Sequence, residues 1–332
     1  MGYLKKIKSL LLLSILMVLT LALAACGSDS SNGDGDGGGD GDKPKFLQMV
    51  TGGTSGTYYP LGGEIAQIIT DETGIQTDAV ASNASAENVA SLRDGDAEIG
   101  FVQTDVMAYA VEGINAFEGK PVDNVLALAS LYPETIQIVT AADSDINSVE
   151  DLKGKTVSVG APASGTYVNA EQILEVYGMT MDDIDVQNLD FDESTGGIQD
   201  GNIDAAFITA GAPTGAIEGL AATTPVKIVP LEQDKIAALI EKYPYYAEDT
   251  VPAGTYQLEE DVSTVAVLAM LAISDSVSED VAYDITKAIF ENADSLTHAK
   301  AEYITLESAL DGIGMKLHPG AEKYYKEQGI ME

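Results

Sequence analysis

The tetrapeptide Ser-Gly-Thr-Tyr occurs twice in this chain, at residues 55–58 and at residues 164–167. Each copy lies in a glycine-rich turn between two kinds of segment. A strand-like run precedes it, at 46–50 in one case and 156–159 in the other. Apolar residues at helical spacing follow it. The sequence therefore predicts the same strand, turn and helix unit in two places.

A second pair of segments repeats at nearly the same offset, at residues 95–102 and 201–208. Each begins with a helix end, continues with an acidic residue and finishes with a short apolar strand. Two features that recur at nearly one offset indicate two lobes of similar construction. Strands that alternate with helices predict α/β lobes with mainly parallel sheets.

The chain is expected to pass between these lobes twice. We assign residues 45–135 and 258–332 to lobe I and residues 136–257 to lobe II. Residues 262–273 have the pattern of a buried strand, and Ser278 is expected to cap the amphipathic helix that follows. The predicted fold has two α/β lobes, a hinge and a ligand cleft between them.

The first 44 residues predict where the protein is located. Three lysines precede an apolar run at 10–23, and Leu-Ala-Ala comes directly before Cys26. This is the pattern of a secretory signal, and its end resembles the bacterial lipobox. We expect residues 1–25 to be removed, Cys26 to carry a lipid, and residues 26–44 to form a flexible tether. The body would be extracytoplasmic and anchored to the cell membrane, in a periplasm or on the outer face.

Composition excludes several classes of function. The chain has 53 acidic and 17 basic residues and a formal net charge of −36, so nucleic-acid binding is not expected. Two histidines and one cysteine are too few for a structural Cys/His zinc site, and no metal is expected. Dinucleotide, P-loop and nucleophile-elbow motifs are missing, so we expect no cofactor and no enzyme. The acidity itself fits either salt adaptation or a functional role.

The two glycine-rich turns have the chemistry of an anion site. A turn that opens a helix presents unpaired backbone N–H groups and the positive end of the helix dipole. Gly56 and Gly165 lie in these turns. Four hydroxyl groups stand beside them, those of Ser55, Thr57, Ser164 and Thr166. Two such turns that face each other across a cleft would hold one small carboxylate ligand from both sides.

Polar residues also follow the buried strands, at the sheet edge where open α/β sheets bind ligands. In the first half they are Gln103, Thr104 and Asp105, and in the second half Thr209, Gly211 and Pro213. Arg93, the chain's single arginine, lies at the expected exposed end of a helix. Neutral donors would therefore bind the ligand.

Four segments in order resemble the TAXI family of extracytoplasmic solute receptors of TRAP transporters. They are residues 51–63, 100–106, 211–214 and 317–325. The resemblance runs from about residue 45 to the C-terminus. It implies a type II periplasmic-binding-protein fold whose lobes close on glutamate, glutamine or 2-oxoglutarate. It also implies a TRAP permease partner driven by an ion gradient, usually of sodium.

The resemblance also implies the contact residues. They are Ser55, Thr57, Tyr58, Ser85, Gln103 and Asp105 in lobe I and Ser164, Gly165, Thr166 and Thr209 in lobe II. Tyr132 and Glu134 lie near the predicted crossing and would reach the ligand or the hinge, whereas Tyr324 and Tyr325 are expected to pack in the core. The sequence departs from the family at Gln137, where a histidine is common.

These observations predict a lipid-anchored receptor for a small organic anion, an amino acid or a dicarboxylate, that delivers it to a TRAP permease. A receptor of an ABC importer is the alternative within the same class. A secreted hydrolase that uses His298 or His318 and a surface adhesin without a small ligand are alternatives of other classes.

Overall fold

The computed structural model describes residues 43–332. The predicted signal segment, Cys26 and the tether as far as residue 42 lie outside the described residues. Within 43–332, no helix has both the length and the apolar character needed to cross a bilayer.

Ten strands of the described chain form one hydrogen-bonded network. Its main path runs in the order β2-β1-β3-β10-β4-β7-β5-β6, while β8 pairs with β4 and β9 pairs with β10. The strands are β1 (Phe46–Val50), β2 (Gln76–Val80), β3 (Ile99–Gln103), β4 (Val125–Ala141), β5 (Thr156–Ser158), β6 (Asp185–Gln187), β7 (Ala205–Ala210), β8 (Val226–Ile228), β9 (Ala247–Val251) and β10 (Val262–Ser274).

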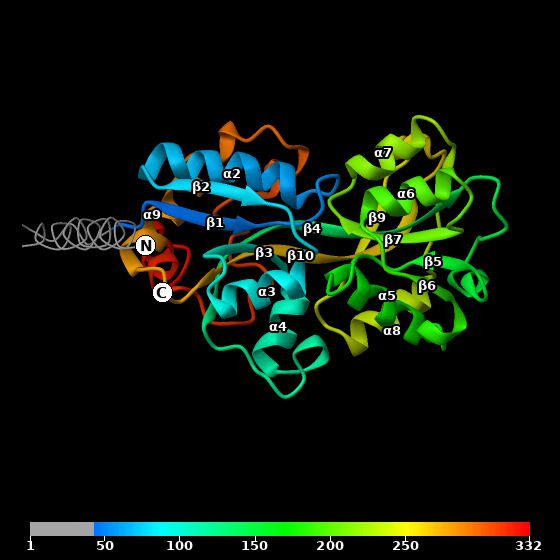
Figure 1. The fold of residues 1–332 in the computed structure, drawn as a ribbon, viewed down its shortest axis with the longest axis horizontal. Helices are drawn as coiled ribbons and strands as arrows, with labels where there is room; N and C mark the ends of the chain where they lie inside the picture. Colours follow the sequence, from blue (N-terminus) through cyan, green and yellow to red (C-terminus); the bar gives the residue numbers. More distant parts are fainter. Residues whose placement is uncertain (1–42) are drawn as a thin grey trace, which may run out of the picture. The chain divides into compact units, whose positions relative to one another are not determined.

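Helices cover both faces of the sheet in each half of the described chain. They are α2 (Tyr58–Thr73), α3 (Ser85–Asp94), α4 (Thr104–Glu112), α5 (Gly165–Val176), α6 (Phe191–Gln199), α7 (Gly215–Ala221), α8 (Gln233–Lys242), α9 (Glu279–Glu291) and α10 (Pro319–Gln328). In Figure 1, α2 lies on one side of β1 and β2, and α3 and α4 lie on the other. The predicted α/β architecture is confirmed, but the sheet is mixed rather than mainly parallel, because β4 and β10 pair antiparallel with all their neighbours.

Alternation of side chains along each strand explains the layers. In β3, Phe101 points into the cluster that α2, α9 and α10 cover, whereas the next residue, Val102, points into the cluster under α3 and α4. In β7, Phe207 and Ile208 divide in the same way between the α5–α8 cluster and the α6–α7 cluster. Because successive strand residues face opposite sides, continuous apolar runs fill two cores at once.

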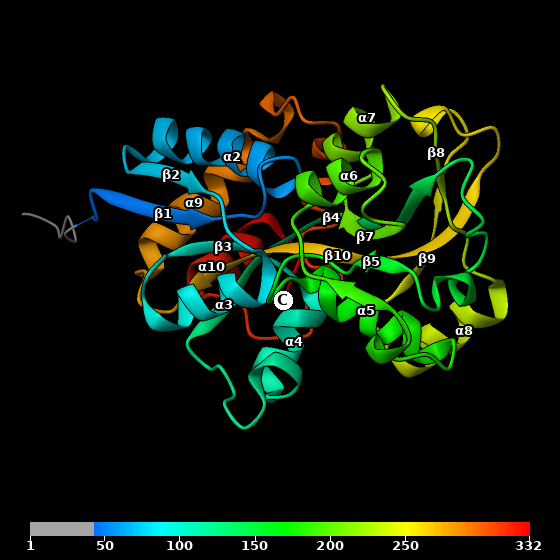
Figure 2. The same ribbon diagram turned by 45° about the vertical axis from the view of Figure 1, so that its right-hand side comes forward.

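Two long strands, β4 and β10, belong to both halves, as Figure 2 shows. Near its start β4 pairs with the last residues of β10, and from Thr135 to Thr140 it pairs with β7. Residues of β4 change from one core to the other between Tyr132 and Ile136, and those of β10 change between Val267 and Ala269. We therefore place the second lobe boundary within β10, and not at 257/258 as expected from the sequence.

The ladder between β4 and β10 is interrupted where the halves meet. Pro133 of β4 pairs with Leu268 of β10, and the register shifts between Leu268 and Met270. Proline offers no N–H to a ladder, and a bulge bends the strand that contains it. This combination is suited to a hinge.

A local signal in the sequence explains where α9 begins. The side chain of Ser278 accepts a hydrogen bond from the Val281 N–H at 3.4 Å, which confirms the predicted cap of α9.

Tyr324 and Tyr325 are buried, and the Tyr325 hydroxyl donates to the Leu128 carbonyl at 2.8 Å. Both tyrosines pack in the core as expected.

Two adjacent glycines of α2 test this packing. A Cβ on Gly62 would lie 2.7 Å from Thr51 Cγ2 and 3.1 Å from Phe101, whereas a Cβ on Gly63 meets nothing within 4 Å. Gly62→Ala should therefore lower the free energy of unfolding by about 1–3 kcal/mol through overpacking. Gly63→Ala, the matched control, should raise it by up to about 1 kcal/mol through helix propensity. Urea denaturation of both variants measures this, and equal effects would contradict the packing described.

Candidate ligand-binding site

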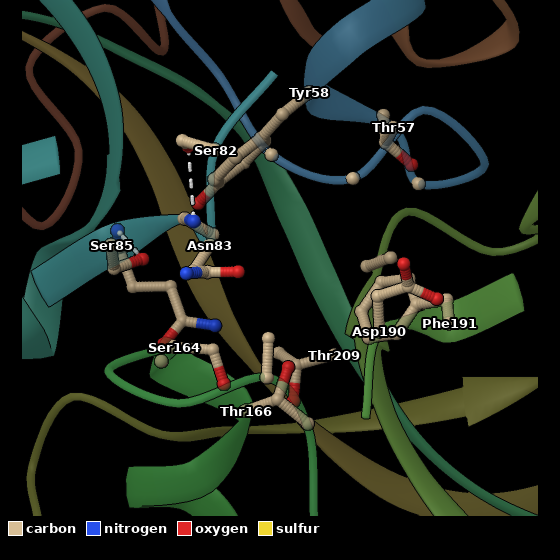
Figure 3. A pocket seen from close by; sticks show the side chains of 18 residues that line it. Thr57, Tyr58, Ser82, Asn83, Ser85, Ser164, Thr166, Asp190, Phe191 and Thr209 are labelled. Atoms are coloured by element: carbon tan, nitrogen blue, oxygen red, sulfur yellow. Dashed lines mark hydrogen bonds between the residues drawn. The ribbon is translucent and has the colours of Figure 1, made fainter. Parts of the chain in front are cut away.

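A cavity lies where the two halves of the described chain face each other across the hinge (Figure 3). The volume open to the centre of a water molecule is about 50 Å³, which suits a small solute. Its lining consists of Gly52, Gly53, Gly56, Thr57, Tyr58, Ser82, Asn83, Ala84, Ser85, Gln103, Ala161, Ser164, Gly165, Thr166, Asp190, Phe191, Thr209 and Ala210.

Four helices begin at this cavity. Their first residues, Tyr58 of α2, Ser85 of α3, Gly165 of α5 and Phe191 of α6, all belong to the lining. The first N–H groups of a helix have no partner inside the helix, and the dipole places partial positive charge at this end. In the described chain, Asp190 is the one lining residue with a formal charge. The positive potential in the cavity therefore comes from backbone groups rather than from lysine or arginine.

Side chains at the helix starts fix the local backbone. Ser164 caps α5, since its Oγ accepts a hydrogen bond from the Tyr167 N–H at 3.1 Å. Asp190 caps α6 in a capping box with Glu193. Ser85 Oγ instead accepts from the Gln103 N–H at 3.1 Å, which ties α3 to the end of β3. Part of the hydroxyl chemistry predicted for ligand is thus already used within the protein.

Two buried polar atoms of the lining have no hydrogen-bond partner among the described residues. They are Oγ1 of Thr209, a residue 5% exposed, and Oε1 of Gln103, a residue 2% exposed. A buried polar group without a partner costs about 1–3 kcal/mol. Such groups beside a cavity are the ones that a bound ligand satisfies.

The two lobes are in contact around the cavity. The Ala86 N–H donates to the Ala163 carbonyl at 3.0 Å, and the Ala216 N–H donates to the Ser55 carbonyl at 3.2 Å. A Cβ on Gly165 would lie 1.9 Å from Gln103 Oε1, so α5 packs directly against the side chain at the end of β3. These contacts describe a closed arrangement of the lobes.

Two buried carboxyl groups lie beside the cavity, although neither belongs to its lining. The Tyr58 hydroxyl donates to Glu134 Oε2 at 2.7 Å. Burial raises the pKa of Glu134 to about 8 and the pKa of Asp105 to about 7. Glu134 is therefore largely protonated at neutral pH and Asp105 only below it, so their repulsion of a bound anion is reduced.

Comparison with known protein families shows the family of this chain. The model of the NMT1-like family matches residues 49–329, most of the chain. The chain belongs to the NMT1-like family.

Three solved structures are similar to this NMT1-like chain. PhnD1 from Prochlorococcus marinus (MIT 9301), in complex with methylphosphonate, has a TM-score of 0.51 and 10% identity, with 87% of this chain and 100% of that chain covered. A protein of Bordetella bronchiseptica RB50 has a TM-score of 0.52 and 16% identity, with 86% and 81% covered. A putative L-cystine ABC transporter from Listeria monocytogenes has a TM-score of 0.48 and 13% identity, with 80% and 98% covered.

The first two similarities show a fold and not a ligand. That fold is the type II periplasmic-binding-protein fold predicted from the sequence, with two α/β lobes joined by two crossing strands. The NMT1-like chain and PhnD1 thus have the same architecture.

Nine residues predicted for the ligand site line the cavity. They are Gly56, Thr57, Tyr58, Ser85, Gln103, Ser164, Gly165, Thr166 and Thr209. Figure 3 shows Thr57, Tyr58 and Ser85 on one side of the cavity and Ser164, Thr166 and Thr209 across from them. The two repeated turns do face each other, but they differ in detail, because Thr57 does not cap α2 and its hydroxyl instead approaches the Gly211 carbonyl at 3.4 Å.

Six predicted residues lie outside the lining of this cavity, so their part in ligand binding stays a prediction. Ser55 contacts α7 through its carbonyl, and Gly211 packs against the Lys300 side chain. Pro213 is exposed to solvent. The other three side chains are buried elsewhere: Thr104 beside Gly312, Asp105 against Asn169, and Tyr132 in the core. Adjacent residues at a strand end point in different directions, so three in a row cannot all face one cavity.

Sequence reasoning missed several lining residues. Ser82, Asn83 and Ala84 follow β2, so the strand-end rule applied to residues 76–80 finds them. Sequence reasoning also missed Asp190 and Phe191. The spacing of Asp190 and Glu193 is a capping-box signal that marks a fourth helix start.

The two histidines have structural contacts. His298 Nδ1 accepts from the Lys300 N–H at 3.1 Å, and His318 Nδ1 accepts from the Gly320 N–H at 3.2 Å. Neither histidine belongs to the cavity lining.

Gln137 is the position where the sequence departs from the TAXI pattern. Its side chain donates to Thr214 Oγ1 at 2.9 Å and accepts from the Tyr256 hydroxyl at 2.6 Å, so its hydrogen bonds lie inside lobe II.

The contact between Gly165 and Gln103 predicts what opens the lobes. Gly165→Ala should hold the lobes apart, because the new methyl group overlaps Oε1 and Cδ of Gln103, a buried side chain with little space into which to move. Small-angle X-ray scattering should show a larger radius of gyration for this variant. Gly196→Ala, at a helical glycine with nothing within 4 Å, is the control and should scatter like the parent chain. An unchanged curve for Gly165→Ala would contradict the closed contact.

Proposed function

We propose that this NMT1-like protein is an extracytoplasmic solute receptor that binds a small organic anion between its lobes and delivers it to a membrane permease. The observation that carries the proposal is the cavity at four helix starts, where the buried Thr209 hydroxyl has no hydrogen-bond partner among residues 43–332. Converging N–H groups bind carboxylate, phosphonate or sulfonate oxygens without a cationic side chain. The protein would act by binding and lobe closure, without catalysis.

The class of ligand follows from the same donors. The TAXI resemblance points to glutamate, glutamine or 2-oxoglutarate. The fold that the chain shares with PhnD1, which was solved with methylphosphonate, makes small phosphonates worth including. A cavity without lysine or arginine in its lining suits a compact anion whose charge is spread over several oxygens. We place amino acids and dicarboxylates first.

The class of permease is a separate proposal. The sequence resemblance favours a TRAP permease, with an ABC importer as the alternative. Among the similar structures, the L-cystine protein is named as a putative ABC transporter, which agrees with the ABC alternative. Its TM-score is 0.48, so the proposal does not rest on that similarity. In both cases, we propose that Cys26 carries the lipid that keeps the receptor at the membrane.

Ligand uptake in cells that produce the receptor and its permease separates the two transporters. Uptake that stops on ATP depletion while the ion gradients are clamped identifies an ABC importer. Uptake that persists without ATP but stops with a sodium ionophore identifies a TRAP permease. Uptake that is unchanged by deletion of the receptor would contradict the receptor role itself.

Thr209→Val tests the binding site. A thermal-shift screen first identifies a ligand among glutamate, glutamine, 2-oxoglutarate, succinate, methylphosphonate and neutral and basic amino acids. A ligand at 100 times its Kd should stabilise the protein by about 2.7 kcal/mol. Thr209→Val removes a hydroxyl that has no protein partner, so stability should be kept while affinity falls by about tenfold, or roughly 1.4 kcal/mol.

Thr264→Val is the matched control, because the buried Thr264 hydroxyl donates to the Ile136 carbonyl at 2.6 Å away from the cavity. It should lower stability and leave affinity unchanged. Ser164→Ala together with Thr166→Ala should also weaken binding, but the loss of the Ser164 cap adds about 1 kcal/mol of destabilisation. Unaltered affinity in Thr209→Val would remove the central support for this site.

A further inference from the structure

One hydrogen bond between the lobes joins two fully buried side chains. Asn169 of α5 donates through Nδ2 to Asp105 Oδ2 of α4 at 3.1 Å, and both residues are 0% exposed. The cavity does not include either residue. Their contact therefore depends on how α4 and α5 approach each other rather than on direct contact with ligand.

Each of these side chains also has one oxygen without a partner among the described residues. Asp105 Oδ1 and Asn169 Oδ1 are buried, and neither makes a hydrogen bond to the described residues. Each is attached to the same carbon as an atom of the existing hydrogen bond, so the two oxygens flank that bond. An ionised carboxylate and an amide oxygen are both acceptors only, and two acceptors cannot satisfy each other.

The surrounding network fixes the amide of Asn169. Its Nδ2 also donates to the Tyr246 hydroxyl at 2.9 Å, and Tyr246 donates to Gln172 Oε1 at 2.6 Å. Gln172 in turn donates through Nε2 to the Tyr109 hydroxyl at 2.8 Å, back across to α4. Because both N–H groups of Asn169 are used, the amide cannot turn over without losing two hydrogen bonds.

We propose that the closed receptor holds one proton between Asp105 Oδ1 and Asn169 Oδ1, in a doubly hydrogen-bonded acid–amide pair that latches α4 of lobe I to α5 of lobe II. The proton is taken up from solvent when the lobes close and is released when they open. The latch rests on the proposed function in one respect, because lobe closure is the step that retains the ligand.

The electrostatic surroundings support this latch. Burial is the main cause that raises the pKa of Asp105 to about 7, and the backbone N–H of Val106 and the Asn169 amide oppose it. Glu134 of β4 is a second acid whose own pKa the charge of Asp105 helps to raise. Three tyrosine hydroxyls also lie in the field of Asp105, those of Tyr109, Tyr245 and Tyr246. No cation is among the causes that act on Asp105 in the described chain.

The sign of the pH dependence follows from linkage. In an open, solvated state the carboxyl has its ordinary pKa near 3.8, and in the closed state the pKa is about 7. Between these values the closed state binds more protons, so lowering the pH favours closure. Above pH 7 both states are ionised, and the closed state has the full cost of a buried, poorly paired carboxylate. From pH 8 to pH 5.5, linkage increases the closure equilibrium constant by about 30-fold.

The test measures closure without added ligand, so its failure and failure of the ligand screen are distinguishable. Spin labels at Gln76→Cys in lobe I and Lys153→Cys in lobe II, both exposed sites, report the distance between lobes in a Cys26→Ser chain. The closed fraction should rise strongly from pH 8 to pH 5.5. Asp105→Asn places a neutral donor where the acid proton would lie, so it should remain closed at both pH values.

Glu134→Gln is the discriminating variant. Its partner Tyr58 lies in the same lobe, so the pH dependence should remain in this variant. A flat profile in Glu134→Gln, or a retained profile in Asp105→Asn, would overturn the assignment. If Asp105→Asn does not fold, infrared spectra of Glu134→Gln decide the matter. A protonated carboxyl band from a buried group should be present at pH 5.5 and lost above pH 8, and its absence at pH 5.5 would refute the latch.

Discussion

The antiparallel pairing of β4 with β10 is the interaction on which the rest of the structure depends. These two strands carry backbone hydrogen bonds from the sheet of one lobe into the sheet of the other. The two sheets are therefore continuous at the junction between the lobes. The ladder is interrupted at Pro133 and by the register shift after Leu268. Strong pairing on either side and a weak point between them allow two rigid lobes to move about one hinge.

The site uses backbone dipoles where many anion sites use arginine. A guanidinium would bind an anion tightly, but it has a cost when it is buried without one. Helix N-termini provide positive potential that is fixed by the fold and remains in place in the unliganded state. The neighbouring acids fit this design, because burial raises the pKa of Glu134 to about 8 and so keeps that carboxyl largely neutral. The field of the surface charges is largely screened beyond about 8 Å at physiological salt, so groups close to the ligand, rather than the formal charge of −36, should decide ligand choice.

Local patterns predicted the parts of the fold that depend on near neighbours. The strand at 46–50, the cap at Ser278 and the glycine turn before Gly165 each follow from a few adjacent residues, and each was found. The resemblance and the strand-end rule placed nine residues in the cavity lining. Neither of them predicted the direction in which each side chain points. Gln103 faces the cavity, whereas Asp105, two residues later on α4, faces Asn169 of the other lobe.

The sequence by itself determined two α/β lobes, the two turns that open helices, and a binding chemistry of neutral donors. These follow from local properties of the chain, because the spacing of apolar residues and the positions of glycines and hydroxyl side chains can be read from adjacent residues. Only the tertiary structure decided which hydroxyls are free. Ser164 caps α5 and Ser85 bonds to the end of β3, whereas Thr209 has no partner in the part of the chain that the structure describes. It also brought Asp105 to Asn169, 64 residues away in the chain. Such contacts depend on the angle between lobes, which is set by the packing of many distant residues and is not encoded in any one segment.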